Sequence, residues 1–133
     1  MKVVLLTLVL LASSCATAQT ATVLPDDSSQ KGSAVILMRL INTGEATYHI
    51  QKGTYGDFQQ LVDAKVLNTK YARFADGKQF NAANPNQPVP GLHLNLSLLA
   101  AGSGYQTSVL VEGHDWGFYS DQDAVIFEMH PIR

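Results

Sequence analysis

The sequence of 133 residues contains one cysteine, Cys15, and few charged side chains. A single cysteine excludes an internal disulfide framework and any metal site that needs several thiolates. Charged residues make up 15% of the chain, against roughly 25% in an average globular protein. The nine Lys and Arg residues are outnumbered by eleven Asp and Glu residues. Because these nine cations are spread along the chain, we expect no nucleic-acid partner.

Sequence motifs of catalysis are also missing. The chain has no G-x-S-x-G, no G-x-G-x-x-G between a strand and a helix, and no Walker sequence. None of the four histidines stands in an H-E-x-x-H arrangement. We therefore expect a chain without enzymatic activity, cofactor or metal, although a metal site stays open in which His114 and Asp115, in one turn, join His130 at the end of a neighbouring strand. Asp121 and Asp123 are interpreted as an Asx-type turn, because position six of a calcium loop begun at Asp121 is Ile126.

The first eighteen residues are typical of an export signal. Residues 3–12 form an apolar run of ten, whereas a helix that crosses a bilayer needs about 20. Two processing routes are open. One is cleavage after Ala18, in the small-x-small pattern that begins at Ala16; the other is lipidation of Cys15, whose preceding residues look like a bacterial lipobox. Both routes predict a periplasmic or secreted protein, which is anchored to a membrane only if Cys15 is lipidated.

Residues 19–32 are expected to form a flexible tether, since they include Pro25 and show little apolar periodicity. A single domain over residues 33–133 follows. Ser33 is the expected N-cap of a helix that runs to Gln51. Its apolar stripe has helical spacing and comprises Leu37, Leu40, Ile41, Gly44 and Tyr48. Away from this stripe the pattern places Arg39, Asn42, Glu45 and His49, so a Glu45–His49 pair would be solvated.

The remaining pattern predicts one short helix and four strands. Asp57 is expected to cap a helix over residues 58–67, and residues 71–90 are expected to be irregular because three prolines fall close together. Alternating or β-rich runs separated by turn residues then predict an antiparallel meander. Its strands are expected at residues 92–98, 105–112, 116–119 and 124–129. The fold class is therefore α+β, with a long N-terminal helix and a short helix packed on a four-stranded antiparallel sheet.

Three segments in this order resemble the globular region of type IV pilin-like and pseudopilin-like proteins. They are residues 40–48, which contain INTGEATY, residues 53–62, which contain YGDFQQLV, and residues 117–126, which contain FYSDQDAVI. In a bacterial subgroup of that family, a helix of the form INTAEATY leads to YGSFADLV, and a late hairpin ends in a FYTDQSGVIR-like strand. The resemblance covers roughly residues 33–128 and implies a helix packed on an antiparallel sheet.

The resemblance implies a structural role rather than a catalytic one. The family's globular domain carries no catalytic set to transfer, and the sequence shows no Gly-Phe-Thr-Leu-x-Glu-type processing site followed by a long apolar helix, so filament assembly is not implied. We expect an exported, non-enzymatic structural or interaction module of the bacterial cell envelope, with another envelope protein as its partner.

An alternative function is a periplasmic domain that binds a small ligand or a glycan. The candidate surface is an aromatic patch of Trp116, Phe118 and Tyr119. Strand alternation places Trp116 and Phe118 on one face and Tyr119 on the other. The competing interpretation is that Trp116 and Phe118 belong to the core between helix and sheet.

Overall fold

The computed structural model describes residues 27–132, and the predicted processing residues Ala16, Ala18 and Cys15 lie outside this range. Two helices come first, α1 (Asp27–Lys52) and α2 (Phe58–Asp63). Four strands follow, which are β1 (Leu92–Leu98), β2 (Tyr105–Val111), β3 (Gly117–Asp121) and β4 (Phe127–Met129). Single 3-10 turns occur at Thr69–Tyr71, Ala75–Gly77 and Ala100–Gly102. The order confirms an α+β fold in which a long helix precedes a four-stranded sheet.

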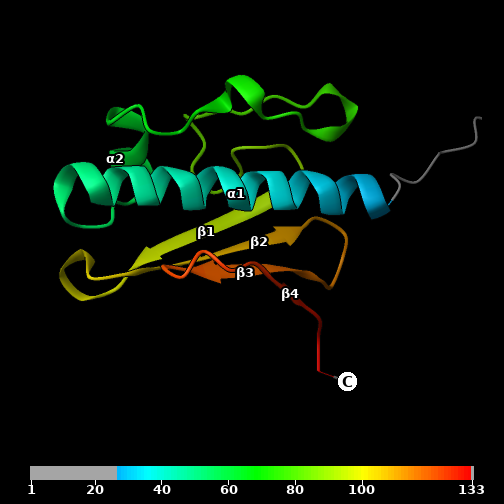
Figure 1. The fold of residues 1–133 in the computed structure, drawn as a ribbon. Helices are drawn as coiled ribbons and strands as arrows, with labels where there is room; N and C mark the ends of the chain where they lie inside the picture. The colour runs from blue at the N-terminus through cyan, green and yellow to red at the C-terminus, as the bar shows by residue number, and fades with distance from the viewer. Residues whose placement is uncertain (1–26, 133) are drawn as a thin grey trace, which may run out of the picture.

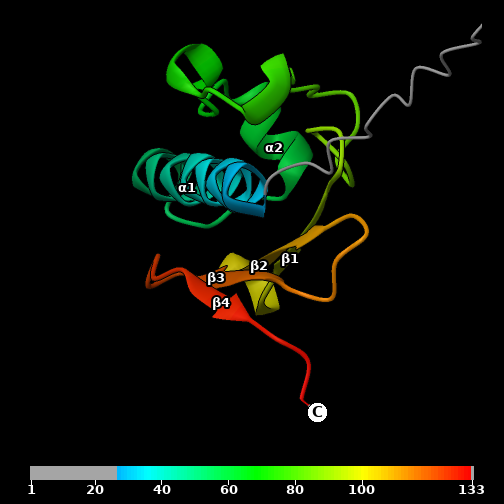
Figure 2. The ribbon, with the colours of Figure 1, turned by 90° about the vertical axis from the view of Figure 1, so that its right-hand side faces the viewer.

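The described residues form three layers, with α1 in the middle. One side of α1 lies along the sheet, and the other side lies against α2 and the irregular segment that leads to β1 (Figure 1). The view along the helix axis shows the same order of layers (Figure 2). The sheet is an antiparallel meander in the order β1-β2-β3-β4, as predicted. Its register places Val109 opposite both Leu94 and Phe118, and these side chains are buried beneath α1.

The helix α1 begins at Asp27, so the predicted start at Ser33 was wrong and residues 27–32 are helical rather than part of a tether. Asp27 places a carboxylate in the first turn, where the helix dipole favours negative charge. The Ser33 hydroxyl does not cap its own helix. Its Oγ accepts a hydrogen bond of 2.8 Å from the backbone N–H of Ala75 and so ties α1 to the irregular segment.

The buried face of α1 is wider than the predicted stripe. Every residue of that stripe is buried, as expected: Leu37, Leu40, Ile41, Gly44 and Tyr48. Asn42 and Glu45 were predicted to point away from the core, and this was wrong because both are buried. The reason is that α1 is covered from two sides, by the sheet and by the segment after α2. The side chain of Leu67 packs against Gly44. Its Cδ2 atom is 2.6 Å from the position that a Cβ on Gly44 would occupy.

Element ends differ from the predictions where the backbone turns left-handed. The capping box of α2 is present, because the Asp57 side chain accepts from the Gln60 N–H and the Gln60 side chain accepts from the Asp57 N–H. The helix ends at Asp63 instead of Leu67, since Lys65 has a φ of 57°. Similarly, Ala124 has a φ of 57°, and β4 starts only at Phe127.

The turn before β4 has the predicted Asx form. The Asp121 carboxylate accepts a hydrogen bond of 3.0 Å from the Asp123 N–H, and the Asp121 carbonyl accepts one of 2.8 Å from Ala124. The Asp121 side chain thus bonds the local backbone, as an Asx turn requires.

One edge of the sheet is partly closed by the chain itself. In β1, the Leu92 N–H donates to the carbonyl of Val89 at 3.0 Å, and the Leu94 N–H donates to the carbonyl of Asn86 at 2.9 Å. The proline-rich loop therefore supplies the partners that a neighbouring strand would otherwise supply. The opposite edge is β4, which is only three residues long.

Replacement of Gly32 by alanine should stabilise the domain by about 0.5–1 kcal/mol. Gly32 lies inside α1, and no atom lies within 4 Å of the position that a Cβ would occupy there. Alanine therefore gains helix propensity without a clash. Urea unfolding followed by circular dichroism measures the change, and an equal or lower free energy of unfolding would show that this turn is not helical in solution.

Candidate functional site

The predicted aromatic patch is not one exposed surface. Trp116 and Phe118 are 8% and 5% exposed, and they pack edge-to-face with ring centroids 6.1 Å apart. Both belong to the core beneath α1. Tyr119 lies on the opposite face of β3 and is half-buried. The predicted alternation is therefore confirmed, and the aromatic surface proposed for glycan binding is not formed by these three residues together.

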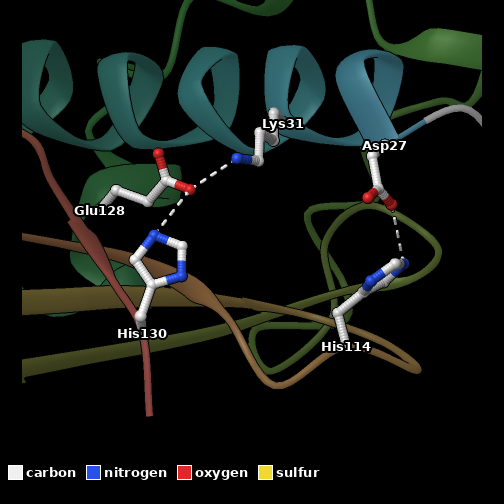
Figure 3. A network of polar contacts seen from close by, with 5 residues as sticks. All are labelled: Asp27, Lys31, His114, Glu128 and His130. Atoms are coloured by element: carbon white, nitrogen blue, oxygen red, sulfur yellow. Dashed lines mark hydrogen bonds and ion pairs between the residues drawn. The ribbon is translucent and has the colours of Figure 1, made fainter. Parts of the chain in front are cut away.

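Polar contacts of Asp27 and Lys31 join the start of α1 to His114, in the turn before β3, and to Glu128 of β4 (Figure 3). His114 Nε2 lies 3.6 Å from Asp27 Oδ1, and His130 Nε2 lies 3.1 Å from Glu128 Oε1. Lys31 contacts the same Glu128 oxygen at 2.6 Å and, by this hydrogen bond, lowers the pKa of the carboxyl. His114 and His130 therefore contact different carboxylates, those of Asp27 and Glu128. Across residues 27–132, no group of three or more His, Cys, Asp or Glu side chains is placed to hold a metal ion.

Glu45 is a fully buried carboxyl group in the middle layer of the fold. Its Oε2 accepts a hydrogen bond of 3.0 Å from the backbone N–H of Gly56, and its Oε1 has no hydrogen-bond partner. Burial raises the pKa of Glu45 to about 7, and the nearby charge of Asp57 adds to the shift, although the bond from Gly56 opposes it. The pair with His49 does not form; the His49 ring stacks instead on Tyr55, with the ring centroids 4.4 Å apart.

Asn42 lies one helical turn before Glu45 and joins α1 to two strands. Its Nδ2 donates to Ser120 Oγ at 2.9 Å, and its Oδ1 accepts from the Tyr105 hydroxyl at 2.9 Å. Tyr105 is also buried, and burial together with the charge of Glu45 raises its pKa. The side-chain amide of Asn42 therefore forms hydrogen bonds within the domain through both its nitrogen and its oxygen. We refer to Asn42, Glu45, Gly56, Tyr105 and Ser120 as the buried polar network.

Comparisons with known proteins identify no relative. No family model, no curated protein and no solved structure matches the chain. The resemblance of the three segments to pilin-like proteins therefore stays a prediction.

The outer face of the sheet is the side that α1 does not cover (Figure 2). Leu110 is 50% exposed and Phe127 is 54% exposed. In the sheet register, Leu110 pairs with Gly117 of β3, and Phe127 pairs with Tyr119 of β3. Met129 pairs with Gly117 from the other side and is half-buried. We call Leu110, Tyr119, Phe127 and Met129 the outer sheet patch. It is an apolar surface that runs across β2, β3 and β4.

Sequence reasoning missed the buried polar network and, apart from Tyr119, the outer sheet patch. Asn42 and Glu45 border the apolar stripe at i and i+3 spacing, and that spacing was the available signal that they share a face. For the outer sheet patch, the signal was the apolar residues Leu110 and Phe127 at positions where alternation predicts solvent.

No described helix has the length and hydrophobicity that a membrane span requires.

Proposed function

We propose that this chain is an exported, non-enzymatic interaction module of the bacterial cell envelope with a pilin-like globular domain. One observation carries the proposal: the three segments that resemble the pilin-like family meet in the buried polar network. Asn42 of the first segment donates to Ser120 of the third, and Glu45 of the first accepts from Gly56 of the second. These residues, which belong to the three segments that resemble the family, therefore hold those segments together in the fold.

The network supports a structural rather than a catalytic domain. Its hydrogen bonds run between side chains and backbone of the same domain, and they fasten α1 to β3 and to the loop before α2. Titratable groups in an active site need to face a substrate. Glu45 has instead no exposed surface.

The outer sheet patch supports the interaction role. Exposed apolar side chains that adjoin one another are typical of protein-binding surfaces. Leu110 and Phe127 are each about half exposed, and no described element covers their face of the sheet (Figure 2). We propose another envelope protein as the partner that covers them.

The export step is tested by expressing the full chain with a C-terminal tag in a Gram-negative bacterium. We expect the tagged protein in the periplasmic or membrane fraction, and its intact mass should show either a start at Gln19 or a diacylated Cys15. Recovery from the cytoplasm with residues 1–18 still attached would refute export.

The partner is tested by photo-crosslinking in the same cells. A photoreactive amino acid at Phe127 or Leu110 should capture the same envelope protein. The control position is Gln59, which is exposed on α2 in the opposite layer. Equal capture from Gln59, or no defined product from either strand position, would refute the outer sheet patch as the binding surface.

A further inference from the structure

Positive charge is concentrated in one short part of the structure. Of the seven Lys and Arg residues between positions 27 and 132, four lie between residues 65 and 78: Lys65, Lys70, Arg73 and Lys78. The sequence-based view that the cations are spread along the chain was therefore wrong for this segment. The chain as a whole has a formal net charge of −2, so this basic segment stands out against an acidic background.

A pocket of about 380 Å³ lies within this segment. Lys70, Arg73 and Lys78 line it, with the rings of Phe74 and Phe80 and the intervening backbone. No carboxylate is among the lining residues, and the one acidic residue of the segment, Asp76, is not part of the wall. The volume falls at the lower end of the usual range for small-molecule sites, which is roughly 300–1,000 Å³.

The three cations of this pocket have no acidic partner among residues 27–132. The ion pairs of that part of the chain involve Lys31, His114 and His130 instead. Arg73 Nη1 donates to the carbonyls of Lys70 at 2.8 Å and Ala72 at 3.2 Å. These two bonds fix the guanidinium and leave its other N–H donors for a ligand.

We propose that this pocket binds a phosphate-bearing anion through Arg73 and Lys78, with Lys70 at its rim. A guanidinium presents paired donors that match phosphate oxygens, and an ammonium adds a point charge. Lys78 is half-buried and lines the pocket together with Arg73. The ligand group is the phosphate of a lipid headgroup or of a soluble phosphate compound. This site goes beyond the proposed function and is separate from the outer sheet patch.

The first test is a titration of the ¹⁵N-labelled full chain with inorganic phosphate and with glycerol phosphate, at constant ionic strength against chloride. We expect saturable amide shifts confined to residues 69–80. The double variant Arg73→Gln/Lys78→Gln should raise the Kd by about tenfold or more, because it removes two charge-assisted contacts. The matched control is Arg39→Gln/Lys52→Gln, which removes the same formal charge from exposed positions of α1 and should leave the Kd within about twofold.

The second test distinguishes the two phosphate sources with vesicles. The full chain is sedimented with vesicles of phosphatidylglycerol and, for comparison, of phosphatidylcholine. Binding to phosphatidylglycerol that is lost only in Arg73→Gln/Lys78→Gln assigns a lipid headgroup, whereas saturable binding of the soluble phosphates alone assigns a soluble compound. Absence of both, or an equal loss in the control variant, overturns the proposal, because attraction by net charge affects both variants alike.

Discussion

The variant Gly117→Ala should lose about 3 kcal/mol of unfolding free energy, or more, because its methyl group has no room. A Cβ at position 117 would lie 2.5 Å from the carbonyl oxygen of Val109 and 3.2 Å from the Cα of Leu110. Both are backbone atoms of β2, which the ladder with β3 holds in place. Relief of the contact requires β2 and β3 to move apart, and their shared hydrogen bonds would weaken.

Urea unfolding of Gly117→Ala is best compared with that of Gly44→Ala. At position 44, the close atom is the end of the Leu67 side chain, which can rotate away, and alanine also favours the helix. Gly44→Ala should therefore cost less than Gly117→Ala. If both variants unfold at the same urea concentration as the parent chain, the register that places Gly117 opposite Leu110 is wrong.

The second large effect is a loss of stability as the pH rises, caused by Glu45. Its pKa is about 7 in the folded protein, against 4.5 for an ordinary glutamate side chain. Between these values the folded chain binds a proton that the unfolded chain has released, so the free energy of unfolding falls with increasing pH. The stabilisation is fully present below pH 4.5 and is lost as the pH passes through 7. The upper limit of the effect is about 3 kcal/mol.

The variant Glu45→Gln should remove this slope. A glutamine stays neutral at every pH in the range, and its oxygen still accepts the hydrogen bond from Gly56. We expect the variant to be more stable than the parent chain at pH 8 and to differ little from it at pH 5.

Urea unfolding at pH 5, 6, 7 and 8 gives the difference in stability between the two chains, in which the contributions of all groups common to both chains cancel. Glu112→Gln is the matched control, since Glu112 is exposed and has the same charge. Parallel stability curves for the parent chain and Glu45→Gln would contradict the burial of an unpaired carboxyl.

Local patterns were sufficient to predict much of the fold. The apolar stripe of α1, the hairpin of β1 and β2 and the Asx turn at Asp121 each follow from spacing or from the chemistry of one turn. The start of α1 was missed because Ser33 looks like an N-cap, yet its hydroxyl is used by Ala75, which lies 42 positions later. A contact at that separation leaves no periodic signal in the sequence.

The burial of Asn42 and Glu45 was missed for a related reason. A single stripe describes a helix with one covered side, whereas α1 has a layer on each side (Figure 2). The sheet buries Asn42 through Tyr105 and Ser120, and the backbone of Gly56 before α2 contacts Glu45; contacts with residues so distant in sequence leave no periodic signal. The basic pocket was not predicted because the cations were counted over the whole chain. A count in windows of fourteen residues would have found four of them at residues 65–78.

The partly closed edge of β1 restricts how two copies of this chain can pair by strand addition. Asn86 and Val89 already occupy the hydrogen-bonding positions beside Leu94 and Leu92. A new strand beside this half of β1 would first have to displace the loop over residues 86–89. At the opposite edge, β4 has no further strand beside it, so pairing of two copies there requires no such displacement.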